Sequence, residues 1–142
     1  MNEILGLLFA VILGGAIGLE REINGKPAGL RTNIIICLGA AAFTLVGLHF
    51  DAPDAPGRIT AGIITGVGFL GAGALIQEGS GVHGLTTAAG IWLVASIGVA
   101  CGTGYYLLAT LVTFLALVAL FGLLPVSKKI RKRRRHKQDY NV

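Results

Sequence analysis

The sequence predicts an all-α fold, a polytopic bundle of five transmembrane helices. Of its 142 residues 54% are hydrophobic and only 13% are charged, whereas soluble domains carry about 25% charged residues. The charged residues cluster in short segments and leave long apolar runs between them. These runs approach the roughly 20 residues that a bilayer span requires. We expect residues 1–125 to form the membrane domain and residues 126–142 a basic cytoplasmic tail.

The first predicted span, residues 4–19, carries small residues at a spacing of four. We call this set the ladder; it consists of Gly6, Ala10, Gly14 and Gly18. Small residues let neighbouring helices approach closely, so the ladder predicts a packing face. If the helix continues, Arg21 lies on this face, with Glu20 and Glu22 on its two sides.

The second predicted span, residues 32–50, follows a polar connection. Gly25, Pro27 and Gly29 interrupt that connection and break the first helix. Thr32 or Asn33 can cap the start of the second span. A short acidic loop follows it.

The third predicted span, residues 59–76, is rich in glycine. Residues 66–71 match the G-x-G-x-x-G pattern of dinucleotide-binding proteins, but they lie inside a charge-free run and no acidic residue follows about 20 positions later. We therefore favour a transmembrane helix that is buried at the centre of the bundle, between neighbouring helices. Its predicted packing residues are Gly62, Gly66, Gly68, Gly71 and Gly73.

Residues 79–127 contain no Asp, Glu, Lys or Arg and are too many for one span. A turn at residues 101–104 divides them into a fourth span, residues 85–100, and a fifth, residues 105–124. We expect Trp92, near the middle of the fourth span, to pack between helices. The Leu-rich fifth span is expected to be the helix most exposed to lipid.

The distribution of basic residues predicts the orientation in the membrane. Eight of the twelve Lys and Arg residues follow the last span, in residues 128–137, and three lie in the first loop. The positive-inside rule therefore places the N-terminus outside and the C-terminus in the cytoplasm. We expect the tail to bind anionic lipid, with an acidic cytoplasmic partner or RNA as the alternative that we do not favour.

This orientation gathers polar residues from the first loop, the third loop and the start of the fourth span at the cytoplasmic end. We call this set the collar: Glu20, Arg21, Glu22, Arg31, Thr32, Glu78, His83, Thr86 and Thr87. It is either a site for a ligand or partner, or a salt-bridged lid in which Arg31 faces a glutamate. The sequence contains no catalytic triad, HExxH or P-loop, so we expect no enzyme and no cofactor, and we leave metal binding open.

The chain resembles the bacterial MgtC/SapB family of membrane proteins. Four segments carry the resemblance within residues 4–100: GLERE at 18–22, KPAGLRT at 26–32, GVGFLGAG at 66–73 and GLTTAA at 84–89. The resemblance implies a plasma-membrane protein of about five spans, linked to growth at low magnesium and to survival inside host cells. Better-known members carry a soluble C-terminal domain, which we expect this chain to lack.

Two functions agree with this resemblance. The first is a non-enzymatic regulator of other membrane proteins; the alternative is an oligomeric channel or transporter for Mg²⁺ or another small ion. The spans lack the mid-membrane carboxylates that Mg²⁺ prefers, which favours the first. Homo-oligomers would form through the ladder or through the third span.

Overall fold

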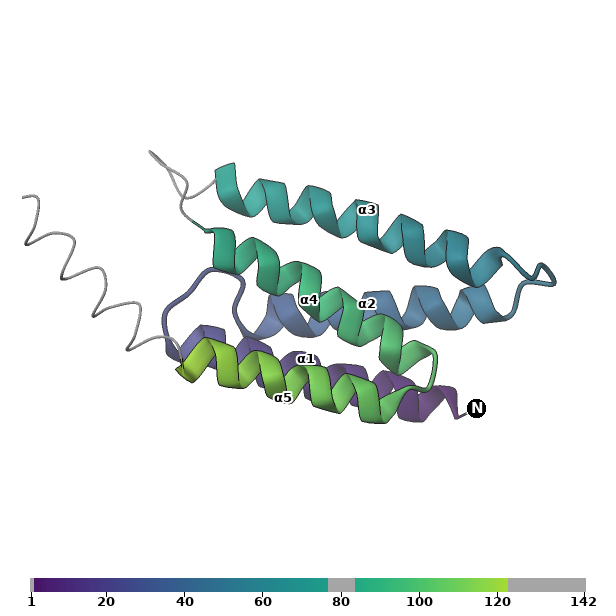
Figure 1. The fold of residues 1–142 in the computed structure, drawn as a ribbon, viewed down its shortest axis with the longest axis horizontal. Helices are drawn as coiled ribbons and strands as arrows, with labels where there is room; N and C mark the ends of the chain where they lie inside the picture. The colour runs from purple at the N-terminus through teal and green to yellow at the C-terminus, as the bar shows by residue number, and fades with distance from the viewer. Residues whose placement is uncertain (1, 77–83, 123–142) are drawn as a thin grey trace, which may run out of the picture.

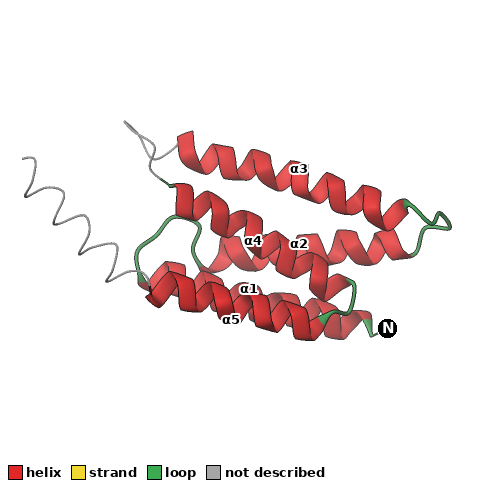
Figure 2. Cartoon of the chain, viewed as in Figure 1, coloured by secondary structure: helices red, strands yellow, loops and turns green. Residues whose placement is uncertain are grey.

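The computed structural model describes residues 2–76 and 84–122. The described residues form five helices, which lie side by side along one long axis (Figure 1). In chain order they are α1 (Glu3–Ile23), α2 (Leu30–Leu48), α3 (Ala55–Ile76), α4 (Leu85–Gly102) and α5 (Tyr106–Gly122). Figure 2 shows only helices and loops within the described ranges. The prediction of an all-α protein with five helices is confirmed.

Helices α1 to α4 are long and apolar enough to cross a membrane. With 21 residues, α1 is roughly 30 Å long, about the thickness of the bilayer's hydrocarbon core. Helix α5 has 17 described residues, at the lower limit of the roughly 17–25 residues of a span. The N-out orientation stays a prediction.

Helix α4 lies at the centre of the bundle and contacts each of the other four helices. Half of its span is buried, compared with 11% of the span formed by α3. Figure 1 shows α3 at one edge of the bundle and α5 at the opposite side. The expectation that the third span is central and buried is therefore wrong.

Two glycines that we did not assign to packing bring α4 onto the backbone of α2. A Cβ atom added at Gly98 would lie 2.3 Å from the carbonyl oxygen of Cys37, and one added at Gly102 would lie 2.7 Å from that of Ala41. Real Cβ atoms essentially never come this close to backbone. Glycine is thus required at both positions for the two helices to meet as they do.

The ladder on α1 is buried inside the same chain. A Cβ atom added at Gly14 would lie 2.6 Å from the Cβ of Cys37, and one added at Gly18 would lie 2.7 Å from the Cα of Leu30. At Gly6 the nearest atom would be the carbonyl oxygen of Cys101, at 2.8 Å. Because α2 and the end of α4 cover this face, the ladder packs within one chain, and homo-oligomerisation stays a prediction.

The glycines of α3 are different, because they meet little within the chain. Added Cβ atoms at five of its six glycines would find no atom of the described residues within 4 Å; these are Gly57, Gly62, Gly66, Gly68 and Gly73. The Cβ of the sixth, Gly71, would lie 3.6 Å from that of Ala88, an ordinary contact. A glycine pattern shows that small residues line one face of a helix, but it does not show which neighbouring element covers that face.

The centre of the bundle is filled by apolar side chains from α1, α2 and α4. The largest of these that are fully buried are Ile17, Val94 and Ile97, beside Cys37 and Cys101. Trp92 does not belong to this core: half of its surface is exposed, at the edge of α3. The expectation that Trp92 is enclosed between helices is therefore wrong, because the face of α4 that carries it is only partly covered.

Substituting Gly98 tests whether the approach of α4 to α2 determines stability. We expect Gly98→Ala to lower the free energy of unfolding by about 1–3 kcal/mol, because the new methyl group overlaps a backbone carbonyl that cannot rotate away. Gly73→Ala is the matched control, since it meets no neighbour and removes only the helix-weakening effect of glycine. Thermal unfolding in detergent measures both, and equal melting temperatures would contradict the expectation.

Candidate functional site

The end of α1 and the starts of α2 and α4 meet at one end of the bundle (Figure 1). Arg21, in the last turn of α1, is buried there. Its Nη2 atom donates a hydrogen bond of 2.8 Å to Oγ1 of Thr87, which is also buried. Because a charged donor strengthens the bond, this contact ties α1 to the first turn of α4.

Glu20, which precedes Arg21 in the chain, is also buried, and only one of its two carboxylate oxygens accepts a hydrogen bond among the described residues. Its Oε1 atom accepts a bond of 2.8 Å from Nδ2 of Asn24. Its Oε2 atom is also buried, and no donor reaches it within the described part of the chain. A buried acceptor without a donor costs about 1–3 kcal/mol, so this carboxyl group is the least satisfied polar group of the site.

Helix α1 ends in a turn that depends on glycine at position 25. Gly25 adopts a positive φ of 59°, its N–H donates to the carbonyl of Glu22, and the N–H of Lys26 donates to that of Arg21. These two bonds form a Schellman motif, which satisfies the last carbonyls of the helix. The carboxylate of Glu22 then accepts the backbone N–H of Leu30, at 2.9 Å, and so joins the end of α1 to the start of α2.

Helix α2 begins at Leu30, and its N-cap residue is Gly29, which has no side chain to cap it. The expectation that Thr32 or Asn33 caps this helix is therefore wrong by one turn. Asn33 instead lies buried inside the first turn, and its Nδ2 atom donates to the carbonyls of Ala28 and, at 2.8 Å, Gly29. The carbonyls of a Gly-rich loop are common partners for such an amide.

Sequence reasoning missed Asn24 and Asn33 as parts of this site. Both are amides that flank the Gly/Pro-rich connection, and both bond to backbone carbonyls within five residues. That local pattern is the signal that could have identified them.

The other collar residues lie on the surface or beyond the described ranges. Arg31, Thr32 and Thr86 are exposed, and no ion pair of Arg31 is found within residues 2–76 and 84–122. The prediction that Arg31 pairs with a glutamate stays a prediction for Glu78; among the described residues Arg31 is exposed, whereas Arg21 lies on the buried face of its helix. Glu78, His83 and the basic tail lie outside the described residues.

Away from the collar, buried polarity is confined to hydroxyl groups that bond to their own helices. Thr44 donates to the carbonyl of Ala40 and Thr113 to that of Ala109, each at 2.8 Å. Within the part of the chain that is described, no group of three His, Cys, Asp or Glu side chains is placed to hold a metal ion. The site can therefore join helices and accept a donor at Glu20.

These features define a multi-pass helical membrane protein with a polar site at one end of the bundle. The family model described as the MgtC family matches residues 7–129. The chain therefore belongs to the MgtC family of bacterial membrane proteins.

Known relatives agree with this assignment. The chain is 46% identical to Protein MgtC of Salmonella typhi over 139 residues, which cover 92% of this chain and 60% of that protein. It is 46% identical to Protein MgtC of Brucella abortus over 95 residues, covering 67% of this chain and 40% of that protein. An uncharacterized protein of Synechocystis is 39% identical over 97% of this chain. The chain thus spans about 60% of the length of the Salmonella protein, and no solved structure matches it.

The bond from Arg21 to Thr87 leads to a stability prediction. We expect Arg21→Ala to destabilise the protein by about 2 kcal/mol or more, because it leaves the buried hydroxyl of Thr87 without its charged donor. Arg31→Ala, which removes an exposed side chain, should leave the melting temperature in detergent almost unchanged.

A double-mutant cycle with Thr87→Val isolates the bond itself. Additive effects of the Arg21 and Thr87 substitutions would contradict a direct interaction. Thr87→Ser, which keeps the hydroxyl group, is the matched control.

Proposed function

We propose that this protein is a non-enzymatic regulator that acts on other membrane proteins during bacterial adaptation to low magnesium. The collar is the proposed contact region. The physiological role rests on membership of the MgtC family, and the mode of action rests on where the buried polar groups lie.

The observation that carries this proposal is that buried polar residues and buried apolar residues lie in different parts of the bundle. Of the buried polar residues, Glu20, Arg21, Asn33 and Thr87 gather at the collar end. Between the two ends, the bundle is filled by side chains such as Ile17, Val94 and Ile97. A packed apolar centre supports a protein that acts through its surface and its collar, and it does not support an ion route through one chain.

The collar also supports a response to a partner. Arg21 and Thr87 join α1 to α4, while the Oε2 atom of Glu20 stays buried without a donor among the described residues. A small rearrangement of these helix ends would let a donor from a partner reach this oxygen. Binding would then be favoured because the partner's donor satisfies an acceptor that has no donor among the described residues.

Flux and complementation measurements together test the proposal. In liposomes loaded with an Mg²⁺ indicator, the purified protein should give no flux above empty liposomes. In a deletion strain grown at low magnesium, the wild type and Arg58→Gln should restore growth, whereas Arg21→Gln should not. Arg58 is a suitable control because it is exposed and pairs with Asp54 at the opposite end of the bundle.

Contact with a partner can be located by photo-crosslinking in native membranes. A crosslinker at Thr86, exposed in the collar, should capture a membrane protein whose activity changes when the chain is deleted, and Arg21→Gln should abolish this capture. The same crosslinker at Asp54, exposed at the other end, is the control. Reproducible Mg²⁺ flux, or equal capture from both positions, would reject regulation through the collar.

A further inference from the structure

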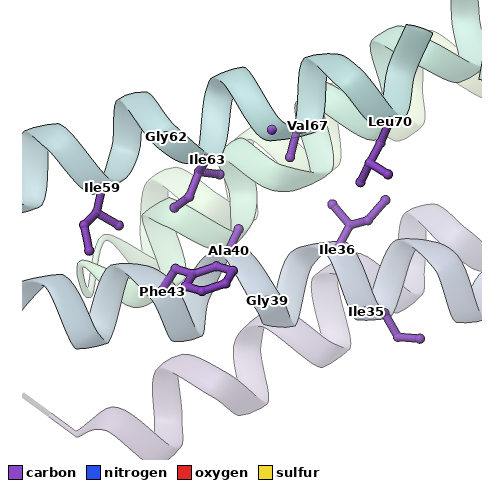
Figure 3. Close-up of a pocket in the computed structure, with 11 residues that line it drawn as sticks. Ile35, Ile36, Gly39, Ala40, Phe43, Ile59, Gly62, Ile63, Val67 and Leu70 are labelled. Atoms are coloured by element: carbon purple, nitrogen blue, oxygen red, sulfur yellow. The ribbon is translucent and has the colours of Figure 1, made fainter. Parts of the chain in front are cut away.

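An apolar groove of about 530 Å³ separates α2 from α3 (Figure 3). Three glycines leave it open: added Cβ atoms at Gly39, Gly62 and Gly66 would meet no atom within 4 Å. Phe43 of α2 and Leu70 of α3 form parts of its walls. The groove faces outward from the bundle, because α3 is an edge helix and Phe43 is 62% exposed.

The groove has a closed end and a definite length. Its α3 wall begins at Ile59, whose side chain packs against Gly47 of α2, where an added Cβ would lie 3.1 Å from Cδ1 of Ile59. From Ile59 to Leu70 the wall rises 11 residues, which is roughly 17 Å of helix. This length is close to the thickness of one leaflet's hydrocarbon, about half of 30 Å.

The lining of the groove decides what kind of molecule suits it. All of its lining residues are apolar or glycine. A single extended hydrocarbon chain matches this lining and can run along the whole length of the groove. Within a bilayer the groove borders lipid, so an acyl chain fills it without any cost of exposing apolar surface to water.

A positive charge stands beyond the open end of the groove. Arg31 precedes Ile35, Gly39 and Phe43 in steps of four residues, so these four residues lie on nearly the same face of α2. Thr32 is exposed beside it. The first amide of α2 is bonded to Glu22, and the exposed side chains of Arg31 and Thr32 offer donors to an anion at this end.

We propose that the groove between α2 and α3 binds one acyl chain of a phospholipid whose phosphate pairs with Arg31. The lipid lies in the leaflet on the collar side, with its chain directed toward the contact of Ile59 with Gly47. Arginine suits this role because its guanidinium group presents paired donors to phosphate oxygens. The two halves of the site, charge and groove, are tested separately.

Native mass spectrometry of the purified protein, delipidated and then titrated with phosphatidylglycerol, measures the binding. We expect one tightly retained lipid per wild-type chain. Gly66→Leu should reduce its affinity about tenfold or more, because the new side chain occupies the groove. Gly68→Leu is the matched control: it adds the same side chain to the same helix, meets no atom within 4 Å and does not line the groove.

The headgroup contact is tested with Arg31→Gln. This variant should lose affinity for phosphatidylglycerol but bind diacylglycerol, which lacks the phosphate, as the wild type does. Arg58→Gln is the control, and free inorganic phosphate should not compete. Equal lipid affinity of Gly66→Leu and Gly68→Leu would overturn the proposal. So would a wild-type dimer that only Gly66→Leu dissociates, since a second copy would then occupy the groove.

Discussion

The approach of α4 to the backbone of α2 at Gly98 and Gly102 is the constraint on which the rest of the bundle depends. In a bilayer the hydrophobic effect does not drive helices together, so their association relies on close packing and interhelical bonds. Two glycines on one face of α4 provide that packing against the carbonyls of Cys37 and Ala41. Once α2 and α4 are joined, the ladder of α1 fits against the pair, and α3 and α5 are left at the edges.

The collar is a consequence of the same packing. Gly14 and Gly18 bring α1 so close to α2 that the next turn of α1 is buried as well, and Arg21 lies on that buried face. A buried guanidinium group needs acceptors, and Thr87 at the start of α4 supplies one. Small residues in the membrane thus determine which polar residues meet at its edge. For this reason a substitution at Gly18 would disturb Arg21 without touching it.

The sequence was sufficient to predict the five helices, the turn after α4 and the placement of Arg21 on the ladder face. Each of these depends on local pattern: apolar length, glycine as a helix breaker and the helical repeat. It was not sufficient to identify the central helix, because α3 and α4 are both rich in small residues. Which of them is covered depends on whether another backbone fills the space at Gly98 or at Gly66, and that is a property of the whole bundle. The burial of Arg21 and the exposure of Arg31 have the same origin, since only the packing decides which arginine faces inward.

Glycine therefore has two physical roles in this chain, and they have opposite structural outcomes. On α1 and α4 the missing side chain is replaced by the backbone of a neighbouring helix, so the space closes. On α3 no part of the described chain replaces it, and the space at Gly62 and Gly66 stays open as a groove. A void in an apolar solvent costs lost dispersion contacts just as a void in a protein core does. In the proposed arrangement an acyl chain completes the packing of α3, so that lipid becomes part of the structure on this side of the bundle.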